Sequence, residues 1–206
     1  MPRYKRRLSD RQDELLDGIY NTARTTGKLK DRRQLKRFLC EYYRNISEDD
    51  VREHSPATLA SAALAHLAHG FRVHDGEHRL RIYNPTMAEH GWQSSRTVVE
   101  LVHENMPFLV DSVGMTLDRL GYAIELTVHP LLRGERTAKG QFRRIHARDA
   151  TTGRIESFIR MEIRRETRPD RIDALSAAIE DTLRDVRAAV RDWEPMQTRM
   201  AQAIDR

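Results

Sequence analysis

Residues 97–121 have the sequence TVVELVHENMPFLVDSVGMTLDRLG and pass from a strand pattern to a helical one. The first six residues are rich in β-branched side chains, which favours a central, well-buried strand. The later apolar residues recur at steps of three and four, which predicts an amphipathic helix: Leu109, Val113, Leu117 and Leu120. We expect Asn105 to cap this helix, Pro107 to lie in its first turn and Gly121 to end it. The stretch therefore predicts a strand, a turn and a helix N-terminus.

Patterns on both sides of this stretch predict the rest of an α+β domain. Apolar and polar residues alternate in residues 122–128 and 159–164, which predicts two strands with one buried face each. Short strands are predicted at residues 79–83 and 142–146, and a long amphipathic helix begins at Pro169. From the opening strand onward the order is strand, helix, strand, strand, helix, which is typical of an antiparallel sheet with helices on one face. The first of the short strands is a candidate for an edge position.

The chain divides into four predicted segments. Residues 1–37 form a basic N-terminal arm that is partly helical, and residues 38–75 form a helical segment. Residues 76–193 form the α+β domain. The long helix is expected to break at Pro195, so residues 194–206 begin a further helical region. Because that region ends without a Gly or Asn cap, we expect the native chain to continue.

The net charge of +5 is concentrated near the N-terminus. Residues 1–37 contain 12 Lys and Arg against 5 Asp and Glu, whereas the rest of the chain contains 24 against 26. Such an arm is typical of a solvated segment or of one that docks on an acidic protein surface. The alternative function is a stand-alone binding module whose basic arm contacts nucleic acid or an acidic protein partner. The arm has few aromatic residues that could stack on bases, so no nucleic-acid partner is expected.

The composition favours a soluble, cytoplasmic protein. Of the 206 residues, 39% are hydrophobic and 33% are charged, which is compatible with a buried core. No run approaches the roughly 20 apolar residues of a membrane span, so no membrane contact is expected. Cys40 is the single cysteine, which excludes an internal disulfide and favours a reducing compartment.

No motif assigns catalysis, a cofactor or a metal to this chain. The ten glycines form neither a dinucleotide fingerprint nor a P-loop, and no nucleophile elbow occurs. Six of the nine histidines lie in residues 54–90, where His66 and His69 share a predicted helix face. This interval has no cysteine and no His-Glu-x-x-His motif, which favours solvent-facing histidines over a zinc site. We therefore name no catalytic, cofactor-binding or metal-ligating residue.

The turn between the opening strand and its helix is the candidate functional site. Backbone N–H groups at a helix N-terminus attract a carboxylate or another anion, and Asn105 and Asp111 suit an amino group or a neighbouring subunit. The alternative is an ordinary turn in which Asn105 only caps the helix. His103 and His129 each end a predicted strand and are candidates to meet at one end of the sheet. The candidate residues for effector binding or subunit contact are His103, Glu104, Asn105, Met106, Pro107, Phe108 and Asp111.

The same residues resemble a known family. Residues 103–113, HENMPFLVDSV, and residues 124–132, IELTVHPLL, resemble the N-terminal region of the large bacterial NAD-specific glutamate dehydrogenases. The resemblance covers roughly residues 38–200 and leaves out the basic arm. Flanking blocks agree with it in the family's order: residues 42–45, 83–85, 89–94, 156–159, 185–190 and 192–193.

The resemblance implies an ACT-like module. ACT domains are small ferredoxin-like regulatory units that often bind amino acids near the first strand-to-helix turn and pair through their sheets or helices. In many of them this turn reads Asp-x-Pro-Gly-Leu-Leu, whereas here Phe108 stands in the place of the glycine. A bulky side chain there is expected to keep a ligand from the backbone, so subunit packing becomes as strong a candidate as ligand binding. No strand follows the second helix in the sequence pattern, so residues 80–83 are expected to replace it in the sheet.

The resemblance also implies that catalysis belongs to another part of a longer chain. The parent enzyme would oxidatively deaminate L-glutamate to 2-oxoglutarate and ammonia, with NAD as its cofactor. This segment would carry no cofactor and would serve assembly or allosteric control. Its implied partners are the remainder of its own chain, further copies in a homo-oligomer and an amino-acid effector.

Overall fold

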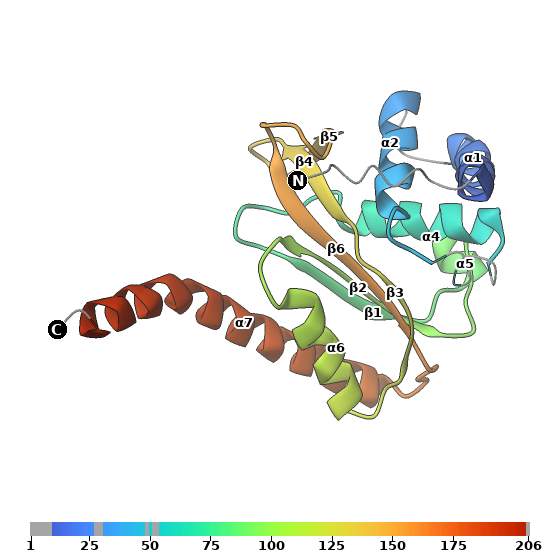
Figure 1. Ribbon diagram of the computed structural model, residues 1–206. Coiled ribbons are helices and arrows are strands. Elements are labelled where there is room, and N and C mark those ends of the chain that lie inside the picture. Colours follow the sequence, from blue (N-terminus) through green and yellow to red (C-terminus); the bar gives the residue numbers. More distant parts are fainter. Residues whose placement is uncertain (1–9, 27–30, 48–49, 51–53, 205–206) are drawn as a thin grey trace.

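The computed structural model describes residues 10–26, 31–47, 50 and 54–204 of the chain. Its centre is an antiparallel sheet of six strands (Figure 1). The strands are β1 (Arg79–Tyr83), β2 (Thr97–Glu104), β3 (Ile124–Val128), β4 (Leu131–Arg136), β5 (Phe142–Ile145) and β6 (Arg154–Ile163). The α+β class predicted from the order of the elements is confirmed.

Strand β6 is the axis of the sheet. Along one side it pairs with β2 over the whole length of that strand. Along its other side it pairs with β3 near one end and with β4 near the other, and β4 in turn pairs with β5. Strand β1 pairs with the free side of β2, as expected for an edge strand. As expected, residues 80–83 lie in the sheet, within an edge strand that precedes β2 in the chain.

Two helices cover one face of the sheet, α6 (Leu109–Arg119) and α7 (Pro169–Ile204) (Figure 1). Their apolar stripes meet the side chains that point to this face from β2 and β6. The buried residues of this cluster are Val99, Leu101, Leu109, Val113, Leu117, Ile159, Met161, Ile163, Leu175, Ile179 and Leu183. Gly121, with φ +81°, follows α6 in the left-handed conformation that glycine adopts readily. The end of α6 is therefore where the sequence predicts it, just before Gly121.

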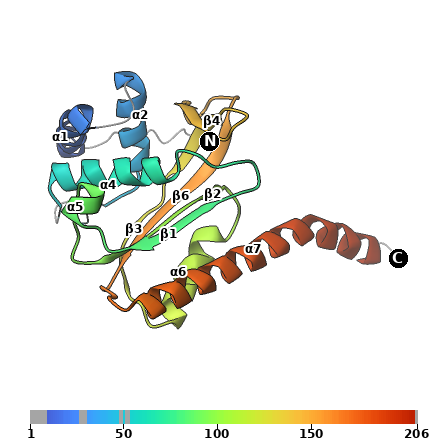
Figure 2. The ribbon, with the colours of Figure 1, turned by 180° about the vertical axis from the view of Figure 1, so that it is seen from behind.

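The N-terminal helices cover the opposite face, as Figure 2 shows from behind. They are α1 (Asp10–Thr26), α2 (Arg32–Tyr42) and α4 (Pro56–His69), and a one-turn helix α5 (Met87–His90) lies between β1 and β2. Because both faces are covered, β6 is not the half-buried strand that its alternating pattern predicts. Its alternate residues Arg160 and Glu162 are 1% and 0% exposed. Alternation identifies two faces of a strand but does not reveal whether the polar face meets water.

The predicted basic arm is largely part of the folded body in the described residues. Leu16, Ile19 and Ala23 of α1 are buried in the same core as the aromatic residues of α2. The predicted boundary between residues 37 and 38 falls inside α2. Lys36 Nζ lies 3.1 Å from Asp17 Oδ1, so part of the basic charge is paired within the fold. Residues 1–9 and 27–30 of the arm lie outside the described part.

Two further expectations are wrong in detail. The long helix does not end at Pro195, because α7 continues without interruption to Ile204. A proline inside a helix removes one hydrogen bond and clashes with a preceding carbonyl, which bends a helix as readily as it ends one. The alternating pattern places Ile124 on a buried face, but Ile124 is 37% exposed, because the pairing of β3 with β6 shifts register between Ile124 and Leu126.

None of the described helices is both long and apolar enough to cross a membrane.

Candidate functional site at the strand-to-helix turn

The turn between β2 and α6 lies further along the chain than the sequence predicts, because β2 extends to Glu104 and α6 begins at Leu109. Asn105 does not cap the helix, because the helix begins only at Leu109; the Asn105 backbone N–H donates to the Ile155 carbonyl of β6 at 3.2 Å. Pro107 precedes the helix, and Phe108 is the N-cap residue, with no side chain bonded to the first helical N–H groups. Met106 is half-buried and packs against the core beneath α6. Glu104, Asn105, Pro107 and Phe108 are all exposed, so the turn presents a continuous stretch of chain to its surroundings.

Phe108 has an unusual backbone conformation. Its φ is +65° and its ψ is −1°, and within the described residues it is the single non-glycine residue with positive φ. This left-handed conformation costs an L-residue about 1–2 kcal/mol because Cβ crowds the following carbonyl. Phe108 therefore has a backbone conformation that glycine adopts readily, and it is 61% exposed. Strain that persists without burial of the side chain is typical of functional rather than structural positions.

His103 lies just before this turn and is held in one neutral form. Its side chain is 2% exposed, Nδ1 donates to the Glu104 carbonyl at 2.7 Å, and Nε2 accepts from Arg187 Nε at 2.9 Å. Burial, helped by the charge of Arg187, lowers the pKa of His103 to about 4. The other end of Arg187 donates to His78 Nδ1 at 3.0 Å, and His78 Nε2 donates to Glu180 at 2.8 Å. These hydrogen bonds connect β2 and the loop before β1 to α7, so His103 positions these elements.

His129 lies at the same end of the sheet, as expected, but on the other side of β6. Its Nε2 lies 2.6 Å from Ser157 Oγ, and Ser157 is the residue of β6 that pairs with His103. Burial lowers the pKa of His129, while the nearby Asp111 carboxylate acts in the opposite direction. A serine bonded to a histidine and an acidic neighbour is the pattern of an activated nucleophile. Ser157 is fully buried, so this group cannot present a nucleophile to a substrate.

The outer side of α6 carries exposed apolar residues. Phe108 and Met115 lie two helical turns apart on one side, with Asp111 between them, and Met115 is 71% exposed. Ile124 continues this surface onto β3, because its Cδ1 lies 3.6 Å from where a Cβ on Gly114 would stand. We call Phe108, Asp111, Met115 and Ile124 the α6 patch. Apolar side chains gathered beside a strained turn are suited to contact with a protein rather than to catalysis.

The opposite face of the sheet holds a buried polar network that the sequence does not reveal. Glu100 of β2 pairs in register with Arg160 of β6, and the Arg160 guanidinium forms an ion pair with Glu162. Glu100 accepts from Arg81 Nη2 at 2.5 Å and from Tyr83 Oη at 3.0 Å. Alternate charged residues on two central strands are the available signal, but only the strand register brings them together.

His66 belongs to the same buried layer and does not face solvent, contrary to the sequence expectation. Its Nε2 donates to the Leu101 carbonyl at 3.3 Å, and its Nδ1 accepts from Tyr42 Oη at 2.8 Å. Burial lowers the pKa of His66 to about 3, so the ring is neutral at pH 7. It connects α4 to α2 and to the sheet. No group of three or more His, Cys, Asp or Glu side chains in the described part of the chain is placed to hold a metal ion.

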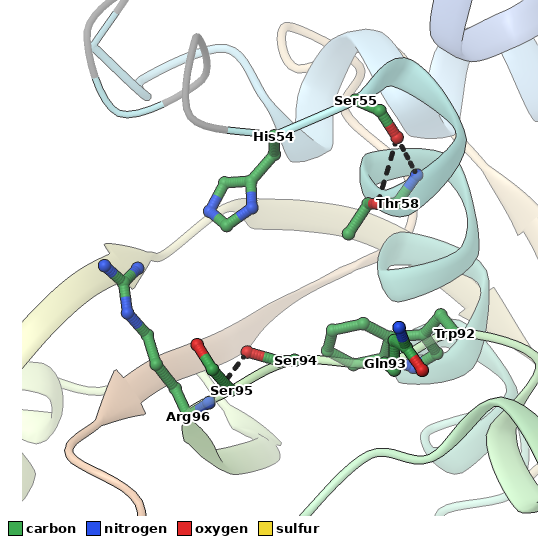
Figure 3. A pocket seen from close by; sticks show the side chains of 8 residues that line it. All are labelled: His54, Ser55, Thr58, Trp92, Gln93, Ser94, Ser95 and Arg96. Carbon is green, nitrogen blue, oxygen red and sulfur yellow. Dashed lines mark hydrogen bonds between the residues drawn. The ribbon is translucent and has the colours of Figure 1, made fainter.

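A polar pocket of about 310 Å³ lies between the start of α4 and the loop before β2 (Figure 3). Its lining consists of His54, Ser55, Thr58, Trp92, Gln93, Ser94, Ser95 and Arg96. Arg96 forms an ion pair with Glu125, and its Nη1 lies 3.7 Å from Glu162. Ser94 Oγ donates to the same Glu162 at 3.3 Å. Because the guanidinium charge is balanced by these two carboxylates, the pocket shows no preference for an anion.

Residues 38–179 match the family model described as "Glutamate dehydrogenase, ACT1 domain". The chain belongs to this family. It is 33% identical over 173 residues to the NAD-specific glutamate dehydrogenase of Pseudomonas aeruginosa, a match that covers 83% of this chain and 11% of that protein. It is also 33% identical over 167 residues to that of Halomonas elongata, with 80% and 10% covered. No solved structure matches the chain.

The family assignment confirms the resemblance seen in the sequence, and the residues of the turn show whether it could bind NAD. The chain spans about a tenth of the length of the two relatives. Residues 103–113 contain no glycine, and the sheet is antiparallel throughout its described strands. A dinucleotide site needs glycines for close approach of the pyrophosphate and a crevice at the ends of parallel strands. This turn therefore does not fit the Rossmann type of NAD site.

Proposed function

We propose that this chain is a non-catalytic, N-terminal regulatory and assembly domain of an NAD-dependent glutamate dehydrogenase. The parent enzyme would oxidise L-glutamate to 2-oxoglutarate and ammonia and pass the hydride to NAD. Family membership supports the proposal, and so does the small share of the relatives' length that the chain matches. The turn at residues 103–113 lacks glycine, which supports a location of NAD binding and hydride transfer in other parts of the enzyme. The single Cys40 suits a cytoplasmic enzyme.

The α6 patch is the proposed assembly surface. The observation that carries this assignment is Phe108, which holds a strained conformation while most of its side chain remains exposed. Burial of Phe108 and Met115 against another subunit would offset that strain, since full burial of such a side chain contributes about 1.5–3 kcal/mol. Asp111 between them supplies a polar contact that fixes orientation. In this assignment the turn residues position the patch and do not take part in chemistry.

The test is charge substitution on the patch in the full-length enzyme. Met115→Asp is expected to lower the oligomeric state, measured by light scattering, because a carboxylate would be buried at the contact. Met87→Asp is the matched control, since Met87 is 59% exposed on α5 and lies outside the patch. Assembly that Met115→Asp leaves unchanged at all protein concentrations would rule out the α6 patch as a subunit contact. Glutamate-dependent reduction of NAD by the same samples shows whether the chemistry depends on assembly.

An amino-acid effector at the same turn is the second candidate. The first helical N–H groups of α6 have no capping side chain, which favours a carboxylate ligand there. Calorimetric titration of the enzyme with a panel of amino acids tests this role. Heat of binding that disappears in Asp111→Asn would support an effector that uses Asp111 to hold an amino group. If no amino acid binds, the turn has an assembly role only.

The length of the natural chain provides a separate test. The gene is expected to continue past Arg206 and to encode a dinucleotide-binding fold further on. A stop codon directly after Arg206 would contradict the assignment to a glutamate dehydrogenase.

A further inference from the structure

The last helix extends well beyond the body that it helps to form. Helix α7 contains 36 residues, which corresponds to a length of about 54 Å. Its first half packs against α6 and the sheet, whereas its outer half projects away from both (Figures 1 and 2). We call residues 190–204 the α7 extension. In both views no other described element lies alongside it.

The apolar face of α7 does not stop where the sheet stops. In the first half of the helix this face is buried, with exposures from 0% to 7% at Leu175, Ile179, Leu183 and Val186. Steps of three and four residues continue this stripe into the α7 extension. Val190 is half-buried, and the large apolar side chains beyond it are exposed: Trp193 54%, Met196 56% and Met200 63%. The same stripe is therefore buried in one half of the helix and uncovered in the other.

Arg191 of the α7 extension lies on the side of the helix away from this stripe. It is paired with Asp192 at 3.3 Å, and both side chains are mostly exposed. Ala189, which directly precedes the extension, is small and allows a second helix to approach closely. An amphipathic helix with an uncovered stripe of this kind pairs best with another amphipathic helix.

The area of the stripe distinguishes between a helix from a second copy of this chain and a helix from the same polypeptide. The α7 extension is about 22 Å long and about 10 Å wide, a contact strip of a few hundred Å². A stable interface between separate proteins needs about 800 Å² from each partner. Two copies of this chain that met through the extension alone would fall short of that area. A helix of the same polypeptide avoids the loss of translational and rotational freedom and is stabilised by a smaller contact.

We propose that the α7 extension is a docking site for an amphipathic helix supplied by another part of the same dehydrogenase polypeptide. The inference rests on the proposed function, because it requires a chain longer than these 206 residues. The relatives, of which this chain matches about a tenth, have ample length to supply such a helix. The extension thereby joins the ACT1 domain to the remainder of the enzyme, and the α6 patch joins subunits.

Oxidation of methionines by hydrogen peroxide, read by peptide mass spectrometry, tests the proposal without any mutation. Oxidation follows exposure, so each methionine reports on its own surface. Met196 and Met200 report on the α7 extension, and Met115 reports on the α6 patch. Met87 is the internal control, with an exposure of 59% that matches the two reporters in the extension. The rates are compared between the 206-residue chain and the full-length enzyme.

Docking predicts that Met196 and Met200 are oxidised at least about fivefold more slowly in the full-length enzyme, while Met87 is unchanged. Equal rates in the two proteins would overturn the proposal. Protection that appears in the 206-residue chain as its concentration rises would overturn it as well, in favour of a second copy. Protection of Met196 and Met200 without protection of Met115 would leave this inference intact and remove the assembly role of the α6 patch. Protection of Met115 without protection of Met196 and Met200 would support the assembly role of the α6 patch and overturn the docking proposal.

Discussion

Arg160→Met is expected to destabilise the folded chain by about 3 kcal/mol. Arg160 is 1% exposed at the centre of the sheet, where its guanidinium pairs with the fully buried Glu162. Removal of one partner from a buried ion pair costs about 3–5 kcal/mol, because the other charge is left without compensation. Glu162 would keep a hydrogen bond from Ser94 at 3.3 Å and the charge of Arg96 at 3.7 Å. These remaining contacts place the expected loss at the lower end of the range.

The double variant Arg160→Met/Glu162→Met is expected to recover most of this loss. Two apolar residues of similar size remove both charges, and such replacements are often neutral or stabilising. Loss of Arg160 Nε and Nη1, two buried donors without a hydrogen-bond partner, is common to the single and the double variant, so the recovery comes from removal of the unpaired Glu162 charge. Arg96 would retain Glu125, and Glu100 would retain Arg81. We expect the double variant to lie within about 1 kcal/mol of the natural chain.

Equilibrium urea denaturation at pH 7, followed by far-ultraviolet circular dichroism, measures both values. Tryptophan emission is a poor probe here, because the Arg160 guanidinium lies 4.8 Å from the centre of the Trp92 ring. Equal m-values in all variants would show that the free energies of unfolding are comparable. A loss below about 1 kcal/mol in Arg160→Met, or a double variant less stable than the single one, would refute the account of the buried network.

Three further predictions follow from the backbone and from the buried histidines. Phe108→Gly is expected to be more stable than Phe108→Ala by about 0.5–1 kcal/mol in thermal unfolding, because only glycine relieves the left-handed strain. The greater freedom of glycine in the unfolded chain offsets part of this gain. Equal stabilities of the two variants would contradict the strain. His103 has a pKa of about 4 in the folded chain against 6.5 as its ordinary value, so the unfolded chain binds more protons between these values and stability falls as the pH falls from 6.5 to 4. His103→Gln should remove about 1.4 kcal/mol per pH unit from the slope of unfolding free energy around pH 5, and an unchanged slope would show that His103 is not buried neutral. Gly140→Ala should lower the free energy of unfolding by about 2 kcal/mol more than Gly76→Ala, as measured by urea denaturation. Both glycines have positive φ, but a Cβ at Gly140 would lie 2.5 Å from the Val73 carbonyl oxygen, whereas a Cβ at Gly76 would meet open space. Similar losses in the two variants would argue against that close approach.

The candidate turn shows how far sequence reasoning reaches at a functional site. The sequence correctly places the end of a strand, a turn and the start of a helix within residues 103–111, because both flanking elements have clear periods. It does not predict the conformation of Phe108 or the contact of Asn105 with Ile155, since each depends on where β6 lies beside the turn. Whether the turn binds an effector or a subunit stays a proposal. Its exposed apolar side chains favour the subunit.

The sequence by itself determined the α+β class, most of the strands and helices but not α5 or β4, the stripes of α6 and α7 that face the core, and the edge position of β1. These features depend on local periodicity and on turn residues such as Gly121, which act over a few residues. Only the tertiary structure decided that the second face of the sheet is covered and that Glu100, Arg160 and His66 are buried. It also decided that the apolar stripe of α7 extends beyond α6 and the sheet, which cover its first half. Such features depend on contacts between segments far apart in the chain. An alternating or helical pattern shows which side chains share a face, but only the packed neighbours determine whether that face meets protein or water.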